Sequence, residues 1–151
     1  RLVKGKDPMK IVVDSTLKIP RSCNLMKNPA KLIIATTIKA SRSEVKRLQQ
    51  KGITAIITKS KKGMVDLQDL MKQLGKHEIT SVMIEGGSEL NSTAIKDGVV
   101  DKILIFTAPK IIGNGLGAIG NLGIKTVDKA INLKNPVAKK IGNDILVEGY
   151  L

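Results

Sequence analysis

The chain has 151 residues, enough for one domain with its own hydrophobic core, and its formal net charge is +13. Its apolar fraction of 42% comes almost entirely from Ile, Val, Leu, Ala and Met, because the sequence holds one Phe, one Tyr and no Trp. This composition argues against a platform for single-stranded nucleic acid, which stacks bases on aromatic rings. The charge favours anionic partners, either phosphorylated small molecules or nucleic acid, and does not choose between them.

The distribution of lysine, cysteine, histidine and apolar residues argues against a nucleic-acid-binding, a metal-binding and a membrane protein. The densest lysine run, at residues 59–62, is short, as on an ordinary solvated surface, so nucleic acid is not the expected partner. The sequence has one cysteine, Cys23, and one histidine, His77, which can form neither an internal disulfide nor a tetrahedral metal site of N and S ligands. No apolar run approaches the roughly 20 residues that cross a bilayer. We therefore expect a reduced, cytoplasmic protein with neither metal nor membrane partner.

Apolar runs rich in β-branched residues alternate with helical patterns, which is typical of β-α-β units on a largely parallel sheet. The runs are nearly continuous, which indicates strands covered by helices on both faces. The predicted strands are Met9 to Val13, Leu32 to Ala35, Ala55 to Thr58, Ser81 to Ile84 and Lys102 to Thr107.

Three helices are predicted between these strands, and each ends at a glycine. The first begins with a capping box, in which Ser41 satisfies an early backbone N–H group and Glu44 reaches back. The first helix runs from Ser41 to Gly52, and the second from about Val65 or Asp66 to Leu74 with Gly75 as the stop. The third follows Glu85-Gly86-Gly87 and ends near Gly98.

The last third of the chain has a different pattern. A glycine-rich stretch, Pro109 to Gly123, is followed by a short helical turn near Val127 to Ile131. The chain closes with a predicted hairpin of Ala138 to Ile141 and Ile145 to Tyr150, joined by a turn at residues 142–143. These antiparallel strands make the predicted sheet mixed. No linker or repeat interrupts the pattern, so we expect residues 1–151 to form a single domain.

Ligands of an open α/β sheet bind beyond the carboxyl ends of its strands. Four segments hold such positions, namely residues 14–18, 36–37, 59–63 and 85–89. The last is the strongest candidate, because a Gly-Gly turn that leads into a helix exposes backbone N–H groups at the positive end of the helix dipole. A simple tight turn is the alternative, since the segment matches neither the G-x-G-x-x-G fingerprint nor the P-loop.

Individual side chains near these strand ends also suit a ligand. Glu85 precedes the two glycines, where it could bond polar ligand groups or be satisfied by neighbouring backbone N–H groups. Ser15 and Lys18 place a hydroxyl and a cation beyond the first strand, as a phosphate requires, although surface turns rich in Ser and Lys are common. Asp14 is expected to form the turn.

Four segments, taken together, resemble the riboflavin-biosynthesis reductases in order and spacing over nearly the whole chain. They are Ile11 to Pro20, Ile84 to Asn91, Val100 to Lys102 and Ala108 to Gly113. The resemblance implies a dihydrofolate-reductase-like α/β fold, with a mixed, mostly parallel sheet flanked by helices and a closing antiparallel hairpin. It also implies NADPH-dependent reduction of the ribosyl group of a ribosylaminopyrimidine 5′-phosphate to ribityl, and a homodimer.

The resemblance further implies a role for each candidate segment. The adenosine-phosphate half of NADPH would lie along Ser15, Thr16, Leu17, Lys18 and Gly63. The pyrophosphate and nicotinamide side would lie at the helix N-terminus, at Gly86, Gly87, Ser88 and Glu89. Glu85 and Leu2 would face the phosphorylated pyrimidine, and no residue is assigned as a catalytic acid or base.

The sequence departs from the family pattern in two places. Ser88 stands where family members often have a third glycine, and the upstream half-site is represented only by Arg1 and Leu2. We therefore expect the first strand and helix of the fold to be missing. A non-catalytic NADPH-binding fragment and a basic RNA-binding α/β domain remain as alternatives. Both the diamino and the deaminated pyrimidine remain possible substrates, and the zinc motif of a fused deaminase is absent from these residues.

Overall fold

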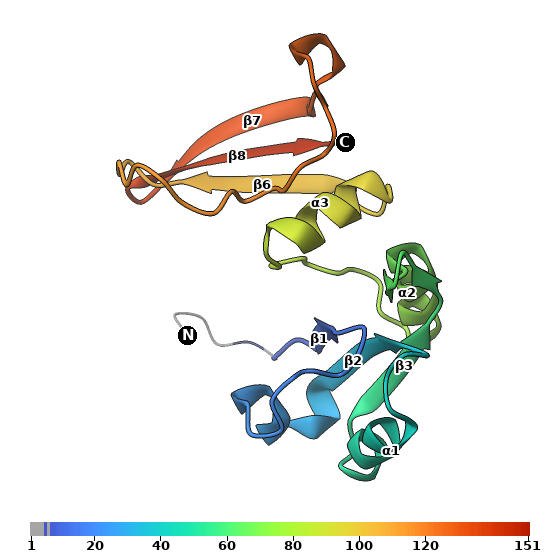
Figure 1. The fold of residues 1–151 in the computed structure, drawn as a ribbon. Helices are drawn as coiled ribbons and strands as arrows, with labels where there is room; N and C mark the ends of the chain where they lie inside the picture. The colour runs from blue at the N-terminus through green and yellow to red at the C-terminus, as the bar shows by residue number, and fades with distance from the viewer. Residues whose placement is uncertain (1–4, 6) are drawn as a thin grey trace. The chain divides into compact units, whose positions relative to one another are not determined.

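A computed structural model describes residue 5 and residues 7–151 (Figure 1). These residues form two compact units, the first ending at Thr80 and the second comprising Ser81–Leu151. Each unit has its own sheet and helices, and each is described by itself. The expectation of a single domain over residues 1–151 stays a prediction.

The first unit is built on a parallel three-stranded sheet. Its strands are β1 (Lys10–Val13), β2 (Leu32–Thr37) and β3 (Thr54–Thr58), in the order β1-β2-β3. Two short 3-10 helices, η1 (Asn24–Lys27) and η2 (Pro29–Lys31), lead into β2. All three strands were predicted from the sequence within two residues of their ends, because β-branched apolar runs are typical of buried parallel strands.

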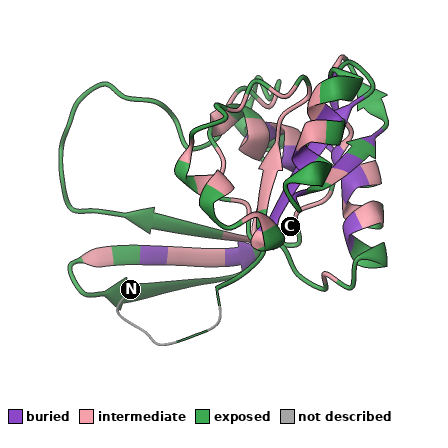
Figure 2. Cartoon of the chain, turned by 90° about the horizontal axis from the view of Figure 1, so that it is seen from below, coloured by how far each residue is buried: buried purple, intermediate pink, exposed green. Residues whose placement is uncertain are grey.

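The core of this unit gathers around β2, all six residues of which are buried. Leu32 and Ile34 pack with Ile53 and with Leu48 of the helix α1 (Arg42–Gln50). Buried residues such as these are coloured purple in Figure 2. Coverage on both faces, which the continuous apolar run predicted, is therefore confirmed for β2.

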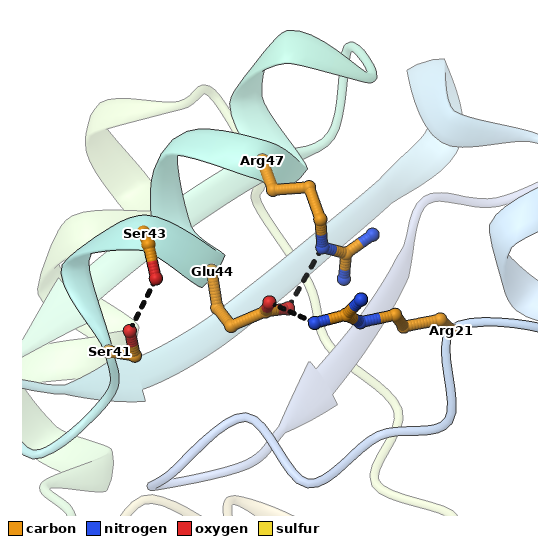
Figure 3. Close-up of polar contacts among 5 residues, drawn as sticks. All are labelled: Arg21, Ser41, Ser43, Glu44 and Arg47. Carbon is orange, nitrogen blue, oxygen red and sulfur yellow. Dashed lines mark hydrogen bonds and ion pairs between the residues drawn. The ribbon is translucent and has the colours of Figure 1, made fainter.

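The helix α1 begins after Ser41 as predicted, but the predicted capping box is wrong. Ser41 Oγ lies 2.8 Å from Ser43 Oγ, and Glu44 turns toward Arg21 and Arg47 (Figure 3). Arg47 Nε donates to Glu44 Oε2 at 2.8 Å. Charge-assisted bonds to a guanidinium are stronger than a bond from a backbone N–H group, so the carboxylate leaves the helix end. The bond from Arg47, supported by the charges of both arginines, lowers the pKa of Glu44.

The helix α2 (Leu67–Lys76) starts after Asp66, whose side chain accepts a hydrogen bond from Asp69 N at 3.1 Å. The predicted stop at Gly75 is wrong, because the helix continues to its C-cap His77. Glu78 instead adopts the left-handed conformation, with φ of 60°. Glycine is favoured after a helix end but is not required there. Two short antiparallel strands, β4 (Ser60–Lys61) and β5 (Met64–Val65), precede this helix and were not predicted.

The second unit contains the helix α3 (Ser88–Lys96) and an antiparallel sheet in the order β6-β8-β7. Its strands are β6 (Lys102–Thr107), β7 (Lys134–Ile141) and β8 (Asp144–Tyr150), and a 3-10 turn η3 (Val127–Lys129) lies between β6 and β7. The third helix, the helical turn and the closing hairpin are confirmed. β7 begins earlier than predicted, because Asn135-Pro136 resembles a turn but lies in an irregularity of an edge strand.

Two expectations for the second unit are wrong. Residues 81–84 form no strand, and Val82 and Met83 are exposed. An apolar, β-branched composition favours an extended chain, but a strand also needs a neighbouring strand to hydrogen-bond with. None of the strands among the described residues pairs with residues 81–84. The second wrong expectation is that helices cover both faces of β6, since only Ile103 of this strand is partly buried. A continuous apolar run therefore predicted the strand β6 but not its coverage.

Candidate functional site

The loop after β1 is shaped by Asp14. Its Oδ1 accepts a hydrogen bond from Thr16 N at 3.2 Å and its Oδ2 accepts one from Ile19 N at 2.7 Å. Leu17 has a φ of 58°, which the two bonds from the flanking residues hold in place. Asp14 is thus the turn-former that the sequence predicted, and it fixes the backbone that carries Ser15, Thr16, Leu17 and Lys18.

Ser15 connects this loop to two other strand ends. Its Oγ accepts a hydrogen bond from Val65 N at 3.1 Å, and its carbonyl oxygen accepts one from Thr37 Oγ1 at 2.8 Å. A serine hydroxyl that accepts one bond keeps its own proton for another acceptor. The predicted segments at residues 14–18, 36–37 and 59–63 are therefore brought to one edge of the parallel sheet, where Ser15 can donate to an anion.

Gly63 lies in the two-residue turn between β4 and β5. Lys62 and Gly63 both have positive φ, of 51° and 82°, which is the backbone of a type I′ hairpin turn. A Cβ atom at Gly63 would lie 2.9 Å from Lys39 Nζ. The sequence missed both the hairpin and Lys39, because strands of two residues show no periodicity and a close approach between distant residues leaves no local signal.

The end of β3 is fixed to α2 through Asp69. Lys59 N and Gln73 Nε2 each donate to Asp69 Oδ2 at 2.9 Å. The bond from the Lys59 backbone is the main cause that lowers the pKa of Asp69. This carboxylate therefore fixes the start of the 59–63 segment to α2.

In the second unit, the glycine turn forms the N-terminus of α3 as predicted. Gly87 is the N-cap, with φ of −72° and ψ of 174°, and no side chain caps the helix there. A Cβ at Gly86 would lie 2.5 Å from Leu90 Cδ2, whereas a Cβ at Gly87 would meet nothing within 4 Å. Gly86 is therefore required for packing, and Gly87 presents open backbone N–H groups at the positive end of the helix.

Part of the glycine-rich stretch packs on this helix end. Gly120 N donates to the carbonyl oxygen of Ser88 at 3.0 Å, and Asn91 Nδ2 donates to that of Ala118 at 2.8 Å. A Cβ at Gly120 would lie 3.0 Å from Ser92 Oγ, so glycine permits the close approach. Sequence reasoning identified the stretch as glycine-rich but did not place it against α3.

The remaining predicted site residues have different outcomes. Glu85 is exposed, so its carboxylate is hydrated and does not require a backbone partner. Ser88 is partly buried and Glu89 exposed, in the first turn of α3. Leu2 lies outside the described residues. Among the described residues, no group of three or more His, Cys, Asp or Glu could hold a metal ion, and no helix is long and apolar enough to cross a membrane.

Comparison with known proteins adds three findings to this geometry. The family model of the RibD C-terminal domain matches residues 1–147. The riboflavin biosynthesis protein RibD of Actinobacillus pleuropneumoniae is 33% identical over 151 residues, which cover 98% of this chain and 40% of that protein. The 2,5-diamino-6-ribosylamino-4(3H)-pyrimidinone 5′-phosphate reductase of Aquifex aeolicus (strain VF5) is 31% identical over 137 residues, covering 89% of this chain and 60% of that protein.

Solved structures support the same fold. Form 2 of Acinetobacter baumannii RibD matches with a TM-score of 0.82 and 20% identity, covering 99% of this chain and 41% of that one. A deaminase/reductase from Thermotoga maritima matches with a TM-score of 0.72 and 22% identity, covering 99% and 39%. The chain thus spans about two fifths of the RibD proteins it matches, and the predicted dihydrofolate-reductase-like α/β fold is confirmed. This chain belongs to the RibD C-terminal domain family.

Proposed function

We propose that this chain reduces the ribosyl group of a ribosylaminopyrimidine 5′-phosphate to ribityl, with NADPH as the hydride donor, in riboflavin biosynthesis. The observation that carries the proposal is the match of residues 1–147 to the RibD C-terminal domain. Relatives named as a pyrimidinone phosphate reductase and as riboflavin biosynthesis proteins support it. The net charge of +13 suits a phosphorylated substrate and a phosphorylated cofactor.

The described residues suit NADPH in two segments. The loop of Ser15 to Lys18, with Gly63, offers a hydroxyl, a cation and a glycine turn to the adenosine-phosphate half. The turn of Gly86 to Glu89 offers open backbone N–H groups to the pyrophosphate and the nicotinamide side. The empty space at Gly87, where a Cβ would meet nothing within 4 Å, supports a close approach of the cofactor to the backbone.

When bound, NADPH supplies a hydride to C1′ of the opened ribosylamine, drawn as an imine. The C=N electron pair then moves to nitrogen, which takes a proton from solvent, and the product is a ribitylamine. The role of the chain is to align the donor and acceptor carbons, and alignment accounts for much of the acceleration in such reactions. Glu85, exposed beside the glycine turn, is proposed to bind the sugar or pyrimidine together with Leu2.

Turnover by the full-length protein tests this proposal. The loss of NADPH absorbance is followed with the diamino and with the deaminated ribosylaminopyrimidine phosphate as separate substrates. We expect oxidation with one of the two, and the faster substrate places the reductase before or after deamination. Glu85→Gln should slow turnover without changing the Kd for NADPH, since the side chain is assigned to the substrate. Binding of NADPH without oxidation by either substrate would instead support a non-catalytic binding domain.

The same proposal includes a cytoplasmic homodimer. The antiparallel sheet leaves large apolar side chains exposed on both faces. Ile105 and Ile145, which are 39% and 50% accessible, lie on one face, and Phe106, which is 59% accessible, lies on the other. Exposed apolar side chains are typical of interfaces between subunits. The predicted contact surface is the closing hairpin, Ala138 to Tyr150.

A further inference from the structure

Lys39 follows β2 at the edge of the parallel sheet where the site segments meet. Its backbone N–H group donates to Thr37 Oγ1 at 3.2 Å, and the same hydroxyl donates to the Ser15 carbonyl oxygen at 2.8 Å. Its Nζ atom reaches the turn between β4 and β5, 2.9 Å from where a Cβ of Gly63 would lie. Lys39 is thus connected to Ser15 through its backbone and to Gly63 through its side chain.

Within the part of the chain that the structure describes, Lys39 has no counter-ion. None of the ion pairs and hydrogen bonds found among the described residues joins a carboxylate to Lys39 Nζ. The acidic groups at the start of α2 have partners of their own, since Asp69 accepts from Lys59 N and Gln73 and Asp66 caps the helix. An ammonium group beside the Gly63 turn suits a phosphomonoester dianion, which accepts charge-assisted hydrogen bonds. The Ser15 hydroxyl accepts a hydrogen bond from Val65 N of the same β4–β5 hairpin.

We propose that Lys39 is the residue that selects the 2′-phosphate of NADPH, with Ser15 Oγ as a neutral hydrogen-bond donor to the same phosphate. Gly63, which has no side chain, leaves room for the Lys39 ammonium group. This inference rests on the proposed function, because it assumes that the adenosine half lies on the first unit. It adds a specificity-determining residue to Lys18, which the sequence had singled out. The backbone of Lys39 reaches Ser15 only through Thr37 Oγ1, whereas its Nζ atom lies directly against the position that a Cβ of Gly63 would take.

The test compares Lys39→Met with the matched control Lys46→Met, which removes an exposed lysine from α1. The probes are NADPH, NADH and adenosine 2′,5′-bisphosphate, titrated into the full-length protein. We expect the Kd for NADPH and for the bisphosphate to rise about 10- to 100-fold in Lys39→Met, the effect of losing a hydrogen bond to a charged group. The Kd for NADH and the thermal melting should not change, and Lys46→Met should bind like the parent.

Failure of this inference can be told apart from failure of the proposed function. If the parent protein binds neither NADPH nor the bisphosphate, the proposed function fails. If the parent binds NADPH but Lys39→Met weakens NADPH and NADH equally, or weakens neither, the assignment of Lys39 is overturned.

Two further measurements test the role of Lys39 even if the Lys39→Met variant is unstable. Lys39→Arg keeps the charge, so it should keep most of the preference for NADPH. Added salt should weaken NADPH binding to the parent more steeply than NADH binding, because an exposed ion pair is screened. A loss of preference in Lys39→Arg as large as that in Lys39→Met, or equal salt slopes, would overturn the inference.

Discussion

Two adjacent glycines at the start of α3 have different reasons to be glycine. A Cβ at Gly86 would overlap Leu90 Cδ2 at 2.5 Å, while the position after it opens into free space at a φ that any residue can adopt. The sequence predicted the turn from the Gly-Gly pair, but the contact with Leu90 depends on the packed helix. Asp14 was predicted correctly as a turn-former because its bonds are local, within five residues.

Replacing Gly87 with Val should leave folding intact and remove cofactor binding. The valine side chain has room in the structure, but it would fill the space where NADPH must lie against the backbone. We expect the Kd for NADPH to rise at least about tenfold, while the melting temperature falls only slightly, because valine is a poorer N-cap than glycine. The contrast is Gly86→Ala, which should lower the free energy of unfolding by about 1 to 3 kcal/mol through overpacking against Leu90. Unchanged NADPH binding in a folded Gly87→Val protein would place the cofactor elsewhere.

Asp69 should make stability depend on pH. Its pKa in the folded protein lies below the ordinary value of 3.8, chiefly because of the bond from Lys59 N. A lowered carboxyl pKa gives stability that is present above the unfolded value and is lost as pH falls through the folded one. Asp69→Asn should therefore have a lower urea midpoint than the parent at pH 7, and the difference should shrink as pH falls below about 4. If the urea midpoints of the parent and Asp69→Asn differ as much below about pH 4 as at pH 7, the charge of Asp69 is not the cause of the lost stability.

Among the elements, the parallel strands could be predicted best. β2 is buried along its whole length, so its apolar residues carry a clear signal. The segment 81–84 has a similar composition and forms no strand, because pairing depends on a neighbour that composition does not specify. The β4–β5 hairpin was missed for the opposite reason, since its backbone turn is specific but its strands are too short to show a pattern.

The central position of β2 predicts a strong effect of one substitution. Ile34→Ala removes side-chain atoms from a fully buried position between Leu48 and Ile53, and we expect a loss of about 2 to 5 kcal/mol in the free energy of unfolding. The control is Ile38→Ala, just past the same strand, where the side chain is 84% exposed. Chemical denaturation of both variants measures the difference. Similar stabilities would contradict the assignment of the core to β2.

For the whole molecule, fold and family could be predicted because several ordered segments of the sequence agree with one another, although each is common by itself. The oligomeric state is harder to predict from the sequence, because the sequence does not show whether an apolar residue is buried in the core or exposed at an interface. Light scattering at micromolar concentration should give the mass of a dimer for the full-length protein. Ile145→Lys, in the closing hairpin, should give a monomer, and Val127→Lys, exposed outside the hairpin, should not. A monomeric parent would contradict the proposed homodimer.

Transfer of label from the cofactor tests the central claim most directly. The full-length protein is incubated with each ribosylaminopyrimidine phosphate and with NADPH that carries deuterium at the hydride position of the nicotinamide. If the chain is the proposed reductase, mass spectrometry of the product will show a ribityl group with one deuterium at C1′, and Gly87→Val will give almost none. If NADPH is consumed without label at C1′, or if the parent leaves both substrates unreduced, the proposed reaction is contradicted.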